Sequence, residues 1–178
     1  YKVPPYILWE EIRGVLKQQD KTLTYQEYEA QSESKVIAKA AYHIYQKYQD
    51  YLQTYQMWDD VDLARSAWRK YLVDRSCWKY DEIIVDEVQD LTKIHFKLLT
   101  NAVNHPTGLF LAGDESQSIH PSKFSWKQVE TILNSNVLVK QNTYFKAYRR
   151  LVENYRSPQS VFELVKAIKR WLQEKWHE

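Results

Sequence analysis

The sequence predicts an α/β fold in which a parallel sheet with flanking helices follows a mainly helical subdomain. Two observations support this prediction. Residues 1–75 carry apolar side chains at three- and four-residue spacing, which is typical of amphipathic helices. Residues 80–112 then hold two short apolar runs on either side of a helical pattern. A strand, a helix and a strand in such close succession form a crossover that pairs the strands in parallel.

The first 75 residues predict several helices in succession. A short helix is expected over residues 7–16, and Thr24 to Glu27 form a capping-box pattern. A long helix is expected from Glu33 to Tyr55, since neither Gly nor Pro interrupts its apolar spacing. Asp60 or Asp62 is expected to cap the next helix.

The apolar pattern of the sequence changes at Tyr80, from helical spacing to short continuous runs. Ile83 to Val85 form a continuous β-branched run, which suits a strand covered on both faces. Residues 91–104 show a helical pattern that His105-Pro106 ends. Residues 109–112 are a second apolar run, which stops at Gly113-Asp114.

The last third of the chain predicts a helix over residues 127–133 and a strand over 137–139. A final helix is clearer, because Ser157 is a capping residue and Pro158 suits the first helical position. Its apolar side chains follow one face from Val161 to Leu172.

Composition limits the classes of protein. A length of 178 residues allows one domain with a core, or a core with a helical appendage. The single cysteine, Cys77, excludes an internal disulfide framework and favours a reducing, cytoplasmic location. No stretch approaches the roughly 20 apolar residues that span a bilayer, so no membrane partner is expected. The net charge of +2 gives no support for a polyanion partner by itself.

Carboxylates follow both predicted strands. Asp86-Glu87 comes after the first strand and Asp114 after the second. Ligands of open parallel sheets bind beyond the carboxyl ends of the strands. Clustered carboxylates repel one another, and a divalent cation, Mg²⁺ above all, or a cationic side chain relieves the repulsion. The alternative is that Asp86, Glu87 and Asp90 only cap the following helix.

Three stretches together resemble the superfamily 1 DNA helicases of the UvrD/Rep type. Val85-Asp-Glu-Val-Gln-Asp90 resembles motif II of that family, and Gly113-Asp-Glu-Ser-Gln-Ser-Ile119 resembles motif III. Leu151-Val-Glu-Asn-Tyr-Arg-Ser157 resembles motif IV. The order and spacing of the motifs agree as well. The resemblance implies part of a RecA-like P-loop NTPase sheet and an ATP-dependent helicase that acts in processes such as DNA repair.

The resemblance also implies roles for individual residues, with ATP and Mg²⁺ as cofactors. Asp86 is expected to hold magnesium through its water shell, and Glu87 to accept a proton from the water that attacks the γ-phosphate. Gln117 is expected to sense the γ-phosphate. Arg156 matches the arginine that stabilises charge on the transferred phosphoryl group.

Single-stranded or partly duplex nucleic acid, most simply DNA, is the partner that the resemblance implies. The family usually has aromatic residues after motif III that stack on bases. Here the stretch is His120-Pro-Ser-Lys-Phe-Ser-Trp126, so His120 replaces the first aromatic. Phe124 and Trp126 are candidates for stacking, and a purely core role for both is the alternative.

Three domains are expected from the resemblance. Residues 1–75 are similar to the helical 1B insertion, residues 76–150 to the C-terminal part of the first motor domain, and residues 151–178 to the start of the second. No Gly-x-x-x-x-Gly-Lys phosphate loop exists among the three glycines. The chain is therefore expected to be inactive alone and to need the remaining helicase domains.

Two explanations for the absent loop stay open. The chain is expected to be a piece of a full helicase, or else a catalytically reduced relative that binds nucleic acid or a protein partner. Retention of Asp86, Glu87, Gln117 and Arg156 favours the first explanation. A third class, a helical scaffold that uses the aromatic face of residues 36–55 to bind a partner, would leave the motifs unexplained.

Overall fold

The computed structural model describes residues 3–18, 22–75, 78–118, 122, 124–135, 149–151, 153 and 155–176. The chain forms two compact units, Tyr1–Tyr144 and Phe145–Glu178. The strand predicted over residues 137–139 lies outside the described residues. Within the described ranges, no helix has the length and apolarity needed to cross a membrane.

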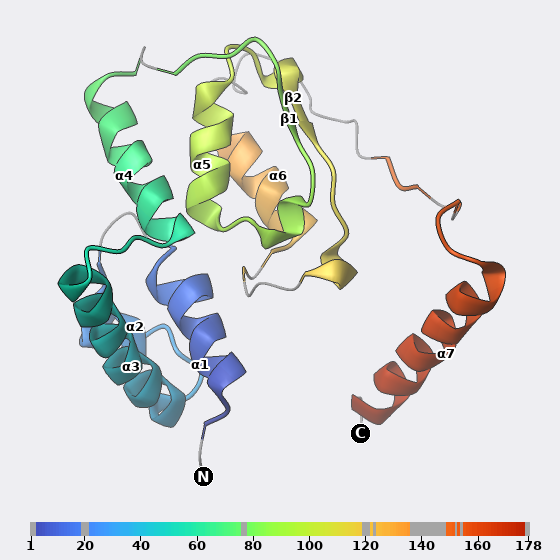
Figure 1. Cartoon of the computed structure of the whole chain (residues 1–178), viewed down its shortest axis with the longest axis horizontal. Coiled ribbons are helices and arrows are strands. Elements are labelled where there is room, and N and C mark those ends of the chain that lie inside the picture. Colours follow the sequence, from blue (N-terminus) through green and yellow to red (C-terminus); the bar gives the residue numbers. More distant parts are fainter. Residues whose placement is uncertain are drawn as a thin grey trace. The chain divides into compact units, whose positions relative to one another are not determined.

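The first unit begins with the helices that the apolar spacing predicted. Helix α1 (Pro5–Glu11) continues into a π-helical turn, η1 (Ile12–Leu16), and is followed by α2 (Tyr25–Glu29) and α3 (Lys35–Thr54). Figure 1 shows these helices side by side at the N-terminal end of the unit. Their shared core consists of Ile12, Leu16, Leu23, Tyr28, Ala38, Ala41 and Tyr45.

Side-chain caps fix the starts of these helices. Thr24 and Glu27 form the predicted capping box of α2. Helix α4 (Asp60–Val73) begins after Asp59, whose Oδ1 accepts the backbone N–H of Asp62 at 2.8 Å. The prediction that Asp60 or Asp62 caps this helix is therefore wrong. Asp59 has the extended backbone of a capping residue, and the other two aspartates lie in the first helical turn.

The sheet consists of two parallel strands among the described residues. Strand β1 (Ile83–Val85) pairs with β2 (Leu109–Leu111), and Val85 lies opposite Leu111. Helix α5 (Lys93–Ala102) connects them after a 3₁₀ turn, η2 (Val88–Asp90). The strands, the helix and their parallel pairing confirm the sequence prediction. The chain is thus mostly helical with a small parallel sheet.

The helices of the first unit cover one face of this sheet. Helices α5 and α6 (Trp126–Ser135) lie on the same side of the strands (Figure 1). A core of Val88, Phe96 and Val129 packs there against Val85 and Leu111. On the other face, Ile84 is 76% exposed and Phe110 is 62% exposed. The prediction that the first strand is covered on both faces is wrong for the described chain, because the described residues place no element over that face.

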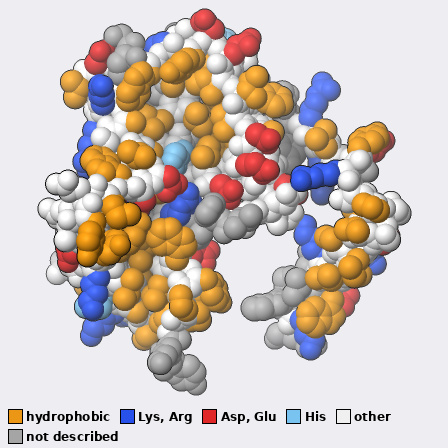
Figure 2. All heavy atoms as spheres, viewed as in Figure 1, with side chains coloured by type: hydrophobic (Ala, Val, Ile, Leu, Met, Phe, Trp, Pro, Cys, Tyr) orange, Lys and Arg blue, Asp and Glu red, His pale blue; other side chains and the backbone are white. Residues whose placement is uncertain are grey.

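Hydrophobic side chains are also exposed on the helical part of the first unit. Figure 2 shows them gathered over the end of α3 and the start of α4. Tyr51, Tyr55, Met57 and Trp58 are each more than half exposed there.

The second unit contains one long helix among its described residues. Helix α7 (Gln159–Trp176) begins one residue later than the sequence predicted, within the usual spread of helix ends. Its apolar residues Val161, Leu164, Val165 and Ile168 are exposed in the described chain. Whether this helix leads into a second motor domain stays a prediction.

Candidate nucleotide site

The two strands end at the same edge of the sheet. The backbone N–H of Ala112 donates to the carbonyl of Val85 at 2.9 Å, and that of Val88 donates to the carbonyl of Ala112 at 3.0 Å. These bonds extend the parallel pairing past Leu111. The acids after β1 and Asp114 after β2 therefore leave the sheet on one side, as the sequence predicted.

Glu87 has a left-handed backbone, with φ 53° and ψ 40°. This conformation costs a residue with a Cβ roughly 1–2 kcal/mol. It is held by local bonds, because the N–H of Glu87 donates to Oδ1 of Asp86 at 2.8 Å and its carbonyl accepts the N–H of Asp90 at 3.1 Å. Such outliers persist where the surrounding structure fixes them, often at functional sites.

Gln89 joins the two strand ends. Its side chain is almost fully buried, with 2% of the residue exposed. The Nε2 group donates to Oε2 of Glu87 at 2.5 Å, and Oε1 accepts the N–H of Asp114 at 3.1 Å. The sequence motifs alone assign Gln89 no role. The signal in the sequence is limited to a Gln next to Val88, and an amide must find partners when it is buried.

Gly113 allows this close approach. A Cβ at this position would lie 2.5 Å from Oε1 of Gln89 and 2.8 Å from Cγ2 of Val88. Both distances are shorter than a van der Waals contact. The backbone after β2 therefore passes directly over Gln89 only because residue 113 has no side chain.

Gln117 lies in a 3₁₀ turn, η4 (Glu115–Gln117), that Asp114 organises. Oδ1 of Asp114 accepts the N–H of Ser116 at 2.9 Å, and Oδ2 accepts Nε2 of Gln117 at 3.0 Å. Both carboxylate oxygens of Asp114 thus hold their own turn. Gln117 is exposed at the edge where the strands end.

The carboxylates at this edge fit a magnesium contact in which the protein supplies a single carboxylate. Among the described residues, no group of three or more His, Cys, Asp or Glu side chains is arranged to hold a metal ion. Asp86 is exposed at the strand end, and Asp114 is engaged by its own turn. One carboxylate with waters and phosphate oxygens is an arrangement that Mg²⁺ accepts.

Phe124 and Trp126 pack into the first unit. The ring of Phe124 lies 5.9 Å from that of Phe96 and 5.2 Å from that of Trp126. The N–H of Trp126 also donates to Oε1 of Glu115 at 2.7 Å. Both aromatic residues are half-buried, so they have a packing role, and stacking on bases stays a prediction. His120 lies outside the described residues.

Arg156 belongs to the second unit, in the exposed turn before α7. Its predicted role beside the transferred phosphoryl group stays a prediction, because the other site residues belong to the first unit.

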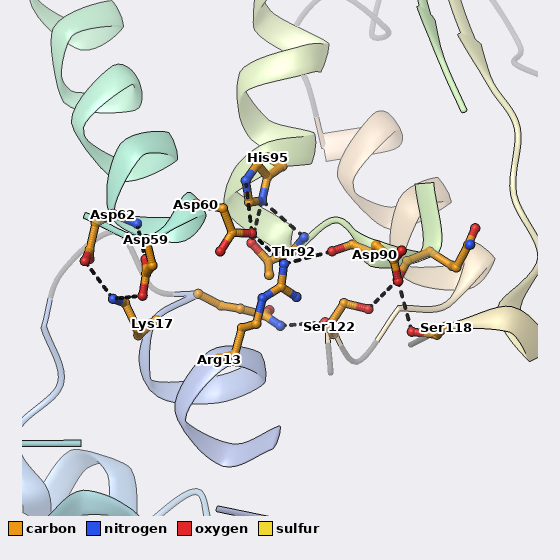
Figure 3. A network of polar contacts seen from close by, with 12 residues as sticks. Arg13, Lys17, Asp59, Asp60, Asp62, Asp90, Thr92, His95, Ser118 and Ser122 are labelled. Atoms are coloured by element: carbon orange, nitrogen blue, oxygen red, sulfur yellow. Dashed lines mark hydrogen bonds and ion pairs between the residues drawn. The ribbon is translucent and has the colours of Figure 1, made fainter. Parts of the chain in front are cut away.

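The N-terminal helical segment contacts Asp90, the last residue of motif II, and Ser122, which follows motif III (Figure 3). Nη2 of Arg13 donates to Oδ2 of Asp60 at 2.6 Å and to the carbonyl of Asp90 at 3.0 Å. Nε2 of Gln18 donates to the carbonyl of Ser122 at 2.7 Å. This segment therefore contacts residues that follow both strands.

A buried lysine holds the same segment against α4. Lys17 is fully buried, and its Nζ lies 2.5 Å from Asp59 and 2.8 Å from Asp62. Burial favours the neutral form of Asp59, but hydrogen bonds from Lys17 and from the N–H of Asp62 outweigh it. The pKa of Asp59 is therefore lowered, and the carboxylate stays ionised beside Lys17.

His95 completes this contact from α5 (Figure 3). Its Nδ1 accepts the N–H of Thr92 at 3.3 Å, which leaves the ring proton of the neutral form on Nε2. Nε2 lies 3.9 Å from Oδ2 of Asp60. Burial lowers the pKa of His95, and the nearby charge of Arg13 adds to this effect, while Asp60 and Asp59 oppose it.

Comparisons with known proteins agree with the motifs. The chain is 29% identical over 129 residues to a probable DNA helicase II homolog of Mycoplasma capricolum, over 68% of this chain and 17% of that protein. It is 33% identical over 90 residues to an ATP-dependent helicase/nuclease protein of Natranaerobius thermophilus, over 49% of this chain and 7% of that protein. It is 26% identical over 183 residues to the human TPR and ankyrin repeat-containing protein 1, over 92% of this chain and 6% of that protein.

The chain thus spans between 6% and 17% of the length of these three relatives. No solved structure matches it significantly. The model of the UvrD/REP helicase N-terminal domain matches residues 8–140, which include both strand ends and the segment that carries Arg13 and Lys17. The chain therefore belongs to the UvrD/REP helicase N-terminal domain family.

Proposed function

We propose that this chain is the part of an ATP-dependent DNA helicase or translocase that supplies the hydrolysis residues of its first motor domain. The observation that carries the proposal is the common edge of β1 and β2. There Glu87 and the Asp114 backbone are bonded to one buried amide, that of Gln89. A base and a phosphate-sensing turn that share one rigid support suit positioned phosphoryl transfer.

Each site residue has a distinct role in this proposal. Asp86 holds magnesium through its water shell, and the carboxylate of Glu87 accepts the proton of the attacking water. Gln117 contacts the γ-phosphate, and Arg156 stabilises the charge that develops on the transferred group. When bound, ATP would supply the phosphoryl group, and its Mg²⁺ would neutralise part of the negative charge on the phosphates.

Nucleic acid contacts are proposed beside the same edge. Phe124 and Trp126, with His120, follow the Gln117 turn in sequence, and stacking of a base on an aromatic ring contributes roughly 1–3 kcal/mol. Because phosphate contacts dominate such binding, the affinity of this chain alone is expected to be weak and sensitive to salt.

A second candidate function is a helicase-like module that binds nucleic acid or protein without hydrolysis. The human relative that matches 92% of this chain favours it, since its name refers to TPR and ankyrin repeats. The chain also lacks a Gly-x-x-x-x-Gly-Lys loop of its own.

ATP hydrolysis by the full-length protein that contains these residues separates the two functions. Turnover is measured with Mg²⁺, with and without single-stranded DNA. The helicase proposal expects magnesium-dependent hydrolysis that DNA stimulates, and no hydrolysis by the 178-residue chain alone. A full-length protein that binds DNA without hydrolysing ATP under any of these conditions supports the binding module instead.

A further inference from the structure

Gln89 contacts three parts of the candidate site at once. Its side chain bonds Glu87 at the end of β1 and the backbone of Asp114 after β2. Its carbonyl accepts Oγ of Ser122 at 2.5 Å and Oγ of Ser118 at 3.4 Å. These serines come from the segment between the Gln117 turn and the proposed stacking residues. One residue therefore links the proposed base, the phosphate-sensing turn and the proposed nucleic acid segment.

The orientation of the Gln89 amide is fixed by its partners. A backbone N–H can only donate, so Oε1 must face Asp114. Nε2 then faces Glu87, where it donates to Oε2. Because Gln89 is buried, water has little access to replace either bond if it is lost. The amide therefore permits one arrangement of the two strand ends.

This arrangement restricts the Glu87 side chain. One carboxylate oxygen is bound to Gln89, and the other is left to accept a proton. An exposed glutamate without such a bond samples several rotamers. Catalysis by a general base requires it to be within hydrogen-bond reach of the water, so small displacements lower the rate.

The N-terminal helical segment is linked to Gln89 through Ser122, which Figure 3 labels together with Arg13. Nε2 of Gln18 donates to the carbonyl of Ser122, and Oγ of Ser122 donates to the carbonyl of Gln89. Arg13 holds the carbonyl of the next residue, Asp90. The path from the helical segment to Glu87 is thus a continuous series of hydrogen bonds through buried groups.

We propose that Gln89 is a positioning residue for hydrolysis, which holds Glu87 and the Gln117 turn in one arrangement and is supported by the N-terminal segment through Ser122. This inference rests on the proposed ATP hydrolysis at the same edge. It assigns to Gln89 no contact with the reacting atoms.

The test is the hydrolysis rate of the full-length protein with Gln89→Glu, measured against pH. A carboxylate at this position cannot donate to Glu87 and repels it, so kcat falls on the order of 100-fold near pH 8. The KM for ATP stays within about twofold, since a positioning residue does not bind the nucleotide. Towards about pH 6 the introduced carboxyl gains a proton, because two adjacent carboxylates share one, and it donates again. The rate relative to wild type then rises.

Matched variants separate positioning from a loss of folding. Gln128→Glu makes the same change on the exposed side of α6 and leaves kcat unchanged at every pH. Gln89→Met keeps the length of the side chain without a titratable group, so it lowers kcat by a similar factor with no recovery at low pH. Ser122→Ala removes one support of the Gln89 carbonyl and lowers kcat by a smaller factor. Thermal melts identify any variant that does not fold.

The outcomes distinguish this inference from the proposed function. Wild-type protein without ATP hydrolysis contradicts the proposed function. If wild type hydrolyses ATP and a folded Gln89→Glu variant keeps its rate near pH 8, or loses it equally at every pH, Gln89 is not a positioning residue. If that variant does not fold, a normal kcat in Gln89→Met overturns the inference. If neither Gln89 variant folds, a normal kcat in Ser122→Ala overturns the inference.

Discussion

At the scale of single residues, the candidate site depends on side chains that each have one defined set of contacts. Gln89 supports Glu87, Asp114 organises the turn of Gln117, and Gly113 leaves room for both. Gln89 is buried, whereas Glu87, Asp114 and Gln117 are exposed. The chemistry proposed for Glu87 therefore rests on a support that single substitutions can test.

The left-handed backbone of Glu87 predicts an unusual effect of glycine. Glu87→Gly should leave the chain more stable than Glu87→Ala by roughly 1 kcal/mol, because glycine adopts this conformation without strain. Urea unfolding of the 178-residue chain measures the difference. At Glu130, on the exposed side of helix α6, the order should reverse, since glycine is the poorer helix former by about 1 kcal/mol. The same order at both positions would show that residue 87 is not strained.

Replacement of Arg156 is expected to affect only the rate of ATP hydrolysis. If Arg156 has its proposed role, Arg156→Ala in the full-length protein should slow ATP hydrolysis by about 10³-fold or more, the effect typical of losing an arginine finger. Arg170→Ala, on the exposed side of α7, is the matched control and should hydrolyse ATP normally. A near-normal rate for Arg156→Ala removes this residue from the site.

At the scale of elements, the start of α4 and the start of α5 meet the N-terminal segment. Asp59 caps α4 and also binds the buried Lys17, and Tyr48 donates to the same carboxylate at 2.9 Å. His95 caps α5 together with Thr92. Both helix starts therefore contribute to the contact with the N-terminal segment.

Removal of the Asp59 carboxylate should cost more than removal of an ordinary cap. Asp59→Ala loses both the cap of α4 and a charged partner of Lys17, together about 2–4 kcal/mol. Thr24→Ala removes the exposed cap of α2 and should cost about 1 kcal/mol. Unfolding in urea compares the two variants. Equal losses would mean that the ion pair with Lys17 contributes nothing measurable.

His95 predicts a dependence of stability on pH. Its pKa is lowered in the folded chain, so the unfolded chain binds a proton at higher pH than the folded chain does. Its contribution is therefore present above about pH 6.5 and is lost as the pH falls through the lowered value. His95→Gln keeps a capping-box residue without titration and should flatten this slope in urea unfolding. His43→Gln, on the exposed side of α3, should leave the slope unchanged.

The elements that were predictable from the sequence are those whose signals are local. The capping box at Thr24, the two strands and the long helix follow from short patterns. That helix was expected from Glu33 to Tyr55 and spans Lys35–Thr54. Three neighbouring aspartates made the cap of α4 ambiguous, and a tertiary contact to Lys17 distinguishes Asp59 from Asp60. The role of Gln89 was not predictable, since its partner Asp114 lies 25 residues away in the sequence.

At the scale of the whole molecule, two apolar surfaces are exposed among the described residues. The sheet has an exposed apolar face at Ile84 and Phe110, and α7 has an exposed apolar side. The β-branched run predicted the strand correctly. The prediction that both of its faces are covered was wrong, because the run itself carries no information on what packs against it. The exposed faces agree with the proposal that hydrolysis requires further domains of the full-length protein.

Steady-state ATP hydrolysis by full-length protein with Glu87→Gln is the sharpest test of Glu87 as the general base. If Glu87 is the general base, turnover is abolished while ATP still binds with near wild-type affinity, because the amide cannot accept the proton of water. Glu82→Gln, an exposed change just before β1, should hydrolyse ATP at the normal rate. Hydrolysis by Glu87→Gln at a rate close to wild type would mean that Glu87 is not the base.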